Sequence, residues 1–342
     1  MPITIGLMGF GRMGRNLFRL LSRSNTVRIG AISDIADHES LTYLLRYDTI
    51  FGRFPDLVTY KAGALYTWGR ETPFLSAKDP GDVRWSDYGV DYVVEATGRD
   101  RARAELERHL AAGARRVLLC VPPREHPDIS VVYGVNDAKL KPEHRLVSNA
   151  SCTAHAAAPL LAILHDAFQV DRAHLTTVHA YTSVQRLADV PAADLRMSRA
   201  AAENIVPSET NAGAVIEEVL PELAGRVRSA ALRVPVLNGS LVDLTVWLAR
   251  AASVDRVNEV VKTAAAGPYR GIVEYQTDPI VSSDVAMSPY SSVFDSLATM
   301  VLRDKLVKTI SWFDNSWGYC HRVVDLLRRF GRDDGKIAEG EA

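Results

Sequence analysis

The feature that most constrains the fold of this chain is a glycine-rich turn near its beginning. Residues 3–8 form a short apolar run, which predicts a buried strand, and Gly9, Gly11 and Gly14 follow it directly. Beyond the glycines, leucines recur at helical spacing. A chain that passes from a buried strand through such a turn into a helix is expected to begin a parallel sheet with helices packed on its faces.

Each glycine of this G-x-G-x-x-G pattern has its own physical reason. The first permits a tight turn, the second lets a pyrophosphate approach the backbone, and the third lets helix and strand pack closely. The start of the helix then offers N–H groups and the positive end of its dipole to the phosphates. The residues of this turn that are predicted to bind a dinucleotide are Gly9, Phe10, Gly11, Arg12, Met13 and Gly14.

An acidic residue follows at the expected distance. A second apolar strand ends in Asp34, about 20 residues after Gly14, where a carboxylate would hydrogen-bond the adenosine ribose. The same carboxylate would repel a 2′-phosphate, so the sequence favours NAD over NADP. The alternative is that Asp34 only caps a following helix. Thr97, at the end of a further predicted strand, completes the predicted cofactor-binding residues.

The remaining pattern predicts two domains, as expected for 342 residues. Residues 1–151 alternate strands with helices, which indicates a Rossmann-type, doubly wound parallel sheet that binds NAD, with a hairpin suggested within 43–85 between parallel strands. Residues 152–316 contain more strands than helices, which favours an α+β catalytic domain with a largely antiparallel sheet. Residues 317–342 are expected to form an amphipathic C-terminal helix that packs back on the NAD-binding domain, followed by a loose polar tail.

The overall composition excludes several classes of protein. A formal net charge of −1 gives no support for binding to nucleic acid or to a membrane surface. Three cysteines are too few for a disulfide framework and fit a reducing compartment. No apolar run reaches the length of about 18 residues that predicts a membrane span, and the N-terminus lacks signal-peptide features. These observations favour a cytoplasmic protein.

Cys152 is the strongest candidate for a reactive side chain. It follows Ser151 and begins an alanine-rich segment, 152–168, that predicts a helix. The positive end of this helix is expected to lower the pKa of the thiol and increase its thiolate fraction. His179, at the end of a predicted strand, could take the thiol proton or stabilise the thiolate. The sequence alone does not show that the two side chains meet.

Seven segments, taken together and in order, resemble one enzyme family. They are GFGRMGR, SNASCT, HAYT, RAAAENIVP, LRVPV, DLTV and SWFDNSWGY. The chain is similar over residues 3–330 to the phosphorylating, NAD-dependent glyceraldehyde-3-phosphate dehydrogenases, and SNASCT is the most specific of the segments. The resemblance implies oxidation of D-glyceraldehyde 3-phosphate to 1,3-bisphosphoglycerate through a cysteine thiohemiacetal and a thioester, with NAD and inorganic phosphate as co-substrates.

The resemblance also implies the roles of individual residues. Cys152 is the implied nucleophile and His179 the implied general base. Asn315 matches the residue that holds the nicotinamide carboxamide, while Thr182 and Arg233 match binders of the phosphate of the substrate. The residues that match the site of the attacking phosphate are Ser151, Thr153, Arg196 and Thr210. The irregular segment 183–199 matches a loop that lines the cofactor pocket of a neighbouring subunit, which implies a homotetramer.

Four positions depart from the family pattern. Val184 stands where threonine or aspartate usually lies beside the substrate phosphate, and its loss of a polar contact would cost about 1 kcal/mol. Asn211 replaces a glycine and is expected to need left-handed backbone angles, which asparagine tolerates better than most residues. Ser316 stands where an acidic residue is frequent, and His155-Ala156 replaces an Asn-Cys pair.

These departures leave other functions open. The aldehyde could be erythrose 4-phosphate, and arsenate could replace phosphate, because both acceptors are tetrahedral oxyanions. A binding or regulatory relative without activity is a further alternative, although such a protein has no chemical need for Cys152 and His179. A zinc site built from Cys152, His155 and His179 is disfavoured because the metal would occupy the nucleophile, and no metal is predicted.

Overall fold

The structure is a computed structural model that describes residues 2–338. The chain forms two compact units, and each is considered by itself. Unit 1 contains the described residues up to Val131, the segment 139–150 and the residues from Cys320 onward. Unit 2 contains the segment 132–138 and residues 151–319.

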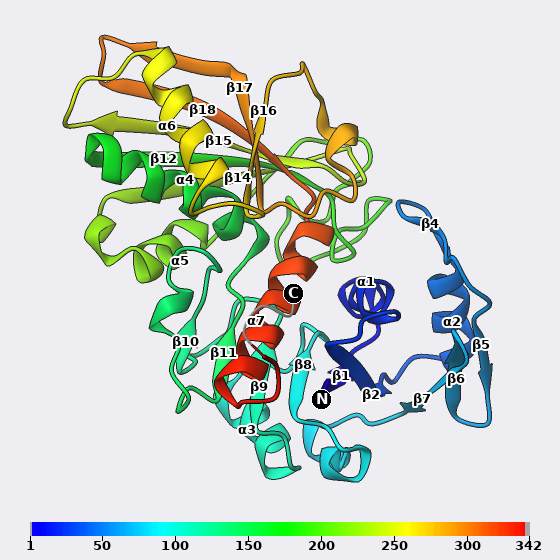
Figure 1. The fold of residues 1–342 in the computed structure, drawn as a ribbon. Coiled ribbons are helices and arrows are strands. Elements are labelled where there is room, and N and C mark those ends of the chain that lie inside the picture. Colours follow the sequence, from blue (N-terminus) through cyan, green and yellow to red (C-terminus); the bar gives the residue numbers. More distant parts are fainter. Residues whose placement is uncertain (1, 339–342) are drawn as a thin grey trace. The chain divides into compact units, whose positions relative to one another are not determined.

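Unit 1 is built around a nine-stranded sheet. Its strands are β1 (Ile3–Met8), β2 (Val27–Ser33), β5 (Thr59–Lys61), β6 (Ala64–Thr67), β7 (Arg70–Leu75), β8 (Tyr92–Glu95), β9 (Arg116–Leu119), β10 (Ile129–Ser130) and β11 (Leu146–Ser148). They lie in the order β10-β11-β9-β8-β1-β2-β7-β6-β5, and all pairs from β10 to β7 are parallel (Figure 1). The central strands are buried almost throughout, as expected for a parallel sheet covered on both faces. The predicted doubly wound sheet is therefore confirmed.

The other elements of unit 1 refine the predictions at its edge. Its α-helices are α1 (Arg12–Leu21), α2 (His38–Arg46), α3 (Arg103–Ala111) and most of α7 (Trp317–Asp333), and its 3-10 helices include η1 (Pro80–Asp82) and η2 (Trp85–Tyr88). A short pair, β3 (Tyr47–Asp48) and β4 (Gly52–Arg53), forms a separate ladder. The suggested hairpin is β5–β6, and it extends the free edge of the sheet instead of lying between parallel strands. Within residues 128–136, the sheet contains only the two residues of β10.

The C-terminal segment is ordered through residue 338, which corrects the expectation of a loose tail from residue 331. The hydroxyl of Tyr92 donates to the carbonyl of Phe330 at 3.1 Å and to the carboxylate of Asp334 at 2.8 Å. Arg116, 3% exposed, donates to the same carboxylate at 3.1 Å. These bonds tie the segment to β8 and β9 because their buried polar groups need partners. Residues 339–342 of the predicted tail lie outside the described residues.

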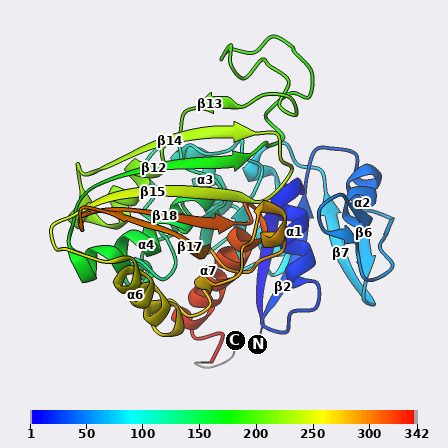
Figure 2. The same ribbon diagram turned by 90° about the horizontal axis from the view of Figure 1, so that it is seen from above.

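Unit 2 is built around a seven-stranded, largely antiparallel sheet, as predicted. Its strands are β12 (Val170–Ala180), β13 (Val206–Ser208), β14 (Val227–Val234), β15 (Ser240–Leu248), β16 (Val273–Gln276), β17 (Ser292–Leu302) and β18 (Leu306–Phe313). The order is β13-β14-β12-β15-β18-β17-β16, and only the β12–β14 and β16–β17 pairs are parallel among the described pairs. Figure 2 shows β14, β12, β15 and β18 running side by side.

Helices of unit 2 cover one face of this sheet. They are α4 (Cys152–Phe168), α5 (Ala212–Val219) and α6 (Val254–Ala266), together with the 3-10 helices η4 (Pro221–Leu223) and η5 (Ser282–Val285). The predicted helix 152–168 is confirmed at both ends. Its small alanine side chains let α4 lie close against β12 and β15, and it is buried along most of its length. Among residues 2–338, every helix is too short or too polar to cross a lipid bilayer.

Candidate active site

The glycine turn between β1 and α1 has the geometry that the spacing predicts. Gly9 has a φ of 94°, and a Cβ there would lie 2.7 Å from the backbone nitrogen of Thr97. A Cβ on Gly14 would lie 2.2 Å from the carbonyl oxygen of Gly9, so helix and strand touch through backbone. A Cβ on Gly11 would meet no described atom within 4 Å. The first and third glycines are thus required by packing, and the second leaves open space where a pyrophosphate would approach.

A pocket of about 150 Å³ lies at this turn. Gly9, Gly11, Asp34 and Thr97 are among its lining residues, so unit 1 brings together four of the predicted cofactor-binding residues. No side chain among the described residues caps the first turn of α1, whose N–H groups therefore need another partner. Open backbone at the second glycine, an uncapped helix start and a carboxylate at the end of β2 fit a dinucleotide.

Asp34 does not cap the following helix. One oxygen of its carboxylate accepts from the Phe10 backbone N–H at 2.6 Å, and the other accepts from the Ala36 N–H at 2.9 Å. The N-cap of α2 is Asp37, whose side chain accepts from the Ser40 N–H at 2.8 Å. The capping alternative for Asp34 is therefore wrong, and its carboxylate instead holds the glycine turn.

Two cationic residues that the sequence did not indicate also line this pocket. They are Lys78 and Arg99, which come from loops after β7 and β8. A lysine or arginine in a loop gives no signal in a single sequence, because most such residues are solvated surface groups. Their positive charge suits a phosphate, and the carboxylates that line the same pocket and oppose a 2′-phosphate are those of Asp34 and Asp100.

Replacing Asp34 with asparagine is expected to raise the ratio of NADP to NAD in kcat/KM by about tenfold or more. Asparagine keeps an oxygen acceptor for the Phe10 N–H and removes the negative charge, while Lys78 and Arg99 remain. Steady-state rates with both cofactors measure the change. Asp37→Asn is the matched control, since it removes a carboxylate three residues away and should leave the ratio unchanged. An unchanged ratio in Asp34→Asn would refute the assigned role.

In unit 2, Cys152 begins α4 directly after a strained turn. Ala150 has a φ of 48°, a left-handed value that is uncommon for a residue with a Cβ. The hydroxyl of Ser151 accepts from the Ala154 N–H at 3.2 Å and caps the helix. This turn presents Cys152 at the first position of α4, where its side chain is partly exposed.

Cys152 and His179 meet in the structure. The Cys152 Sγ lies 3.6 Å from His179 Nε2, within hydrogen-bond distance for sulfur. The other ring nitrogen, Nδ1, lies 2.6 Å from the Ala180 carbonyl oxygen, which can only accept. Nδ1 therefore carries the proton in the neutral imidazole, and Nε2 presents its lone pair to the thiol. This is the tautomer that a proton acceptor for Cys152 requires.

Arg233 is the cation closest to this pair in the sheet register. It lies on β14 directly opposite His179 on the neighbouring β12. Burial raises the pKa of the Cys152 thiol, and Arg233 together with hydrogen bonds from Thr153 only partly opposes this rise. The expectation that the helix end gives a lowered pKa is therefore wrong in its net direction, because desolvation of the thiolate outweighs the favourable charges. Deprotonation of Cys152 consequently depends on a base, which makes the contact with His179 more important.

The residues predicted to bind phosphates occupy several loops of unit 2. Ser151 and Thr153 flank Cys152, and Thr182 follows β12. Thr210 lies between β13 and α5, where its hydroxyl accepts from the Ala212 N–H at 3.2 Å. Arg196 is exposed in the long loop before β13, and its described hydrogen bonds are backbone bonds within that loop. Ser151 and Thr153 thus adjoin Cys152 in the chain, and the side chain of Arg196 has no described hydrogen bond.

Two of the buried polar atoms of unit 2 without hydrogen-bond partners among the described residues belong to predicted site residues. They are Arg233 Nη1, a donor, and Asn315 Oδ1, an acceptor. Asn315 follows Asp314, whose carboxylate accepts from the N–H groups of Ser316 and Trp317 at 2.8 and 2.7 Å. A buried guanidinium N–H suits an anionic substrate group, and a buried amide oxygen suits a carboxamide donor.

The four departures have specific structural outcomes. Asn211 adopts a φ of −95°, so the position needs no left-handed conformation and the expected strain is absent at this residue. Ser316 is buried and donates its hydroxyl to Asp314 at 3.1 Å. His155 is 1% exposed, and its ring meets that of Tyr319 edge to face at 5.8 Å. Val184 is 72% exposed and leaves an apolar group facing solvent.

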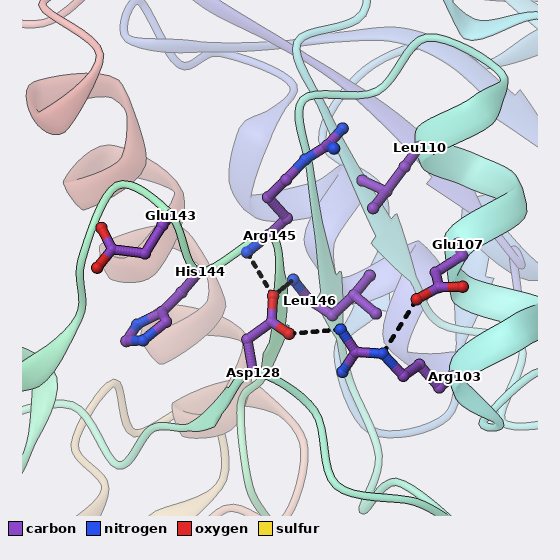
Figure 3. A pocket seen from close by; sticks show the side chains of 8 residues that line it. All are labelled: Arg103, Glu107, Leu110, Asp128, Glu143, His144, Arg145 and Leu146. Atoms are coloured by element: carbon purple, nitrogen blue, oxygen red, sulfur yellow. Dashed lines mark hydrogen bonds and ion pairs between the residues drawn. The ribbon is translucent and has the colours of Figure 1, made fainter.

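Other candidate sites on the chain are weaker. Figure 3 shows a surface pocket of about 660 Å³ in unit 1, in which Arg103 donates to Glu107 and to Asp128, and Asp128 also accepts from two backbone N–H groups. Because its central charges already bind one another, this pocket offers little to a ligand. Within the described part of the chain, no three His, Cys, Asp or Glu side chains gather to hold a metal.

Comparison with known proteins identifies the family. The profile of the glyceraldehyde 3-phosphate dehydrogenase NAD binding domain matches residues 3–103, and that of the C-terminal domain matches residues 151–315. Glyceraldehyde-3-phosphate dehydrogenase 2 of Streptomyces arenae is 46% identical, covering 97% of this chain and 99% of its own length. Glyceraldehyde-3-phosphate dehydrogenase of Geobacillus stearothermophilus is 43% identical, covering 95% and 97% respectively. The chain therefore belongs to the glyceraldehyde-3-phosphate dehydrogenase family.

Proposed function

We propose that this protein oxidises and phosphorylates D-glyceraldehyde 3-phosphate with NAD and inorganic phosphate. The observation that carries the proposal is the 3.6 Å contact between Cys152 Sγ and the unprotonated Nε2 of His179, with Arg233 on the adjacent strand. This arrangement provides a nucleophile, a base in the required tautomer and a cation for an anionic substrate. The full-length similarity to proteins named for this activity supports the substrate.

The first half of the reaction uses Cys152 and His179. As Sγ attacks the aldehyde carbon, His179 Nε2 takes the thiol proton and gives it to the aldehyde oxygen, so that a carbon–sulfur bond and a hydroxyl group form in a thiohemiacetal. His179 then removes a proton from the new hydroxyl group as the carbon loses its hydride and becomes a thioester. Bound NAD supplies the acceptor for that hydride. The thioester conserves the energy of oxidation, since water is not the group that cleaves it.

The second half transfers the acyl group. An oxygen of inorganic phosphate attacks the thioester carbon, the carbon–sulfur bond breaks, and Cys152 leaves as a thiolate. Thr182 and Arg233 are the proposed ligands of the substrate phosphate. The proposed ligands of the attacking phosphate are Ser151, Thr153, Arg196 and Thr210. Hydroxyl and guanidinium donors suit both sites because a phosphate needs positive charge and several hydrogen bonds.

The proposed cofactor site joins backbone and side-chain groups. The turn from Gly9 to Gly14 would hold the pyrophosphate, Asp34 the adenosine ribose, and Asn315 the nicotinamide carboxamide. Thr97 would border the turn. The open position of Gly11 and the buried oxygen of Asn315 support this assignment.

A substrate panel tests the proposed reaction. With NAD, the kcat/KM for D-glyceraldehyde 3-phosphate and phosphate is expected to exceed that for erythrose 4-phosphate by about tenfold or more, because the full-length relatives are named for the former aldehyde. NADH formation is measured for each aldehyde with phosphate or arsenate. A preference for erythrose 4-phosphate would move the assignment to that aldehyde. A wild-type protein inactive with every pair would favour a binding or regulatory relative.

We further propose a homotetramer in the cytoplasm. The loop before β13 exposes large apolar side chains, with Val184, Leu187 and Leu195 at 72%, 71% and 81%. Exposed apolar groups gathered in one loop favour contact with another chain. Sedimentation of the purified protein is expected to give four chain masses, and a stable monomer would contradict the proposal. The free cysteines fit the proposed reducing compartment.

A further inference from the structure

Three buried side chains form a hydrogen-bonded chain behind the cofactor turn in unit 1. Trp85, from η2, donates its indole N–H to Nδ1 of His109 on α3 at 3.0 Å. The Nε2 of His109 lies 3.3 Å from the carboxylate of Glu95, the last residue of β8. All three residues are fully buried. A carboxylate with no exposure is expensive to bury, so its partners need a specific explanation.

The direction of every proton in this chain follows from Trp85. An indole N–H can only donate, so His109 Nδ1 must accept and carries no proton. His109 Nε2 therefore carries the ring proton and donates it to one oxygen of Glu95. Protonation of both ring nitrogens would place two N–H groups against each other at Trp85. His109 is thus held as a neutral imidazole in one tautomer.

Glu95 connects this hydrogen-bonded chain to Thr97. Its other carboxylate oxygen accepts from the Thr97 backbone N–H at 2.7 Å and from the Thr97 hydroxyl. The same hydroxyl accepts from the Arg99 N–H at 3.1 Å. Thr97 and Arg99 both line the cofactor pocket, and the backbone nitrogen of Thr97 is the atom that leaves no space for a side chain at Gly9. The carboxylate therefore fixes the loop that forms one wall of the pocket.

We propose that Glu95, oriented by His109 and Trp85, is a positioning residue for the dinucleotide. It acts through Thr97 and does not itself contact the cofactor. The three side chains come from separate elements and form a linear hydrogen-bonded chain. The chain ends at the backbone of Thr97, which packs against the first glycine of the turn. A simple packing role would not require a fixed proton direction along the chain, so the tautomer of His109 provides a test.

Substituting Glu95 with glutamine sets two donors against each other. The amide oxygen of glutamine can still accept from Thr97, but its NH₂ group then faces the Nε2–H of His109. His109 cannot shift its proton to Nδ1, because Trp85 donates there. If the amide rotates, its NH₂ group instead faces the N–H of Thr97. Either orientation leaves buried donors unpaired, and the Thr97 loop is displaced.

Adding Trp85→Phe is expected to relieve the conflict. Without the indole N–H, His109 can carry its proton on Nδ1 and accept from the glutamine NH₂ group at Nε2. The glutamine oxygen then accepts from Thr97 as Glu95 does. The second substitution removes buried apolar volume, and this loss is expected to lower the melting temperature. Relief of the donor conflict is expected to improve cofactor binding at the same time. A merely structural role would move both quantities in the same direction.

The experiment is a calorimetric titration of the purified full-length protein with NAD. Glu95→Gln is expected to raise the Kd for NAD by about tenfold or more. Trp85→Phe alone keeps the Glu95 carboxylate that accepts from Thr97, and its Kd is the reference for the double variant. The double variant should match Trp85→Phe, which is a recovery of affinity. The alkylation rate of Cys152 by iodoacetamide in the absence of NAD should be unchanged in all three variants.

Glu105→Gln is the matched control. The Glu105 carboxylate also accepts from two backbone N–H groups, those of Arg101 and Ala102 at 2.7 Å each, but no imidazole is among its described hydrogen-bond partners. Its Kd for NAD should therefore equal that of wild type. Wild-type affinity in Glu95→Gln, or a double variant as weak as Glu95→Gln, would overturn the proposal. If Glu95→Gln does not fold, a double variant that binds NAD more than tenfold weaker than Trp85→Phe would overturn it.

The titration needs no aldehyde, so a failure of the proposed aldehyde substrate leaves this test intact. A wild-type protein that does not bind NAD would instead remove the cofactor assignment itself. The two failures are therefore distinguishable.

Discussion

Replacing Cys152 with alanine is expected to lower kcat for NAD reduction by about 10⁴-fold or more. The substitution removes the sulfur that would bond to the aldehyde carbon and that lies 3.6 Å from His179 Nε2. Alanine fits the same helix position, so the fold is expected to persist. The rate of NADH formation with D-glyceraldehyde 3-phosphate measures the loss of activity. Circular dichroism measures whether the fold persists.

The other two cysteines provide the control for this prediction. Cys120 and Cys320 are buried, and burial also raises the pKa of Cys120. Cys320→Ala is expected to retain activity within a few-fold, since the buried Cys320 thiol lies 3.9 Å from the Met13 carbonyl oxygen and is not a proposed ligand of the aldehyde or phosphate. Iodoacetamide should modify Cys152 first because it is the only partly exposed thiol of the described residues. Preferential modification of Cys120 or Cys320 would contradict the assignment of the nucleophile.

Replacing His179 with asparagine is expected to lower kcat by about 10²- to 10⁴-fold and to change its dependence on pH. Burial raises the pKa of the Cys152 thiol, so the thiol stays protonated near neutral pH unless a base takes the proton. Without His179, the residual rate must follow the small thiolate fraction. That fraction grows about tenfold per pH unit below the thiol pKa, so the variant should become faster as the pH rises. Steady-state rates between about pH 7 and 9 give the profile.

His174→Asn is the matched control for this profile. His174 lies on the same strand, β12, five residues before His179, and is exposed to solvent. It should keep both kcat and the pH profile of wild type. A His179→Asn variant whose profile is the same as that of wild type would show that another group removes the proton.

Local features of the sequence predicted the parts of the site that depend on neighbouring residues. The roles of Gly9 and Gly14 follow from the strand and helix beside them, because backbone packing at these positions excludes a Cβ. The alanine-rich helix from Cys152 was likewise predictable to its ends. The tail after residue 330 was not, since its order depends on Tyr92 and Arg116, more than 200 residues away in the chain.

Other features depend on groups that only folding brings together. The net direction of the Cys152 pKa reflects how deeply the thiol is buried, which overrides the helix dipole that the sequence suggested. The backbone angle of Asn211 is set by the start of α5 and differs from the expectation for a replaced glycine. Both errors arise because a residue type was judged without its surroundings.

The amino-acid sequence by itself determined the doubly wound parallel sheet of unit 1, the largely antiparallel sheet of unit 2 and the choice of Cys152 and His179 as the candidate pair, because these depend on periodicity and short motifs. Only the tertiary structure decided the tautomer of His179, the position of Arg233 opposite it, and the linkage of Trp85, His109 and Glu95 to Thr97. The physical reason is that proton direction and pKa depend on burial and on hydrogen-bond partners from distant segments. Such partners leave no local pattern in a sequence.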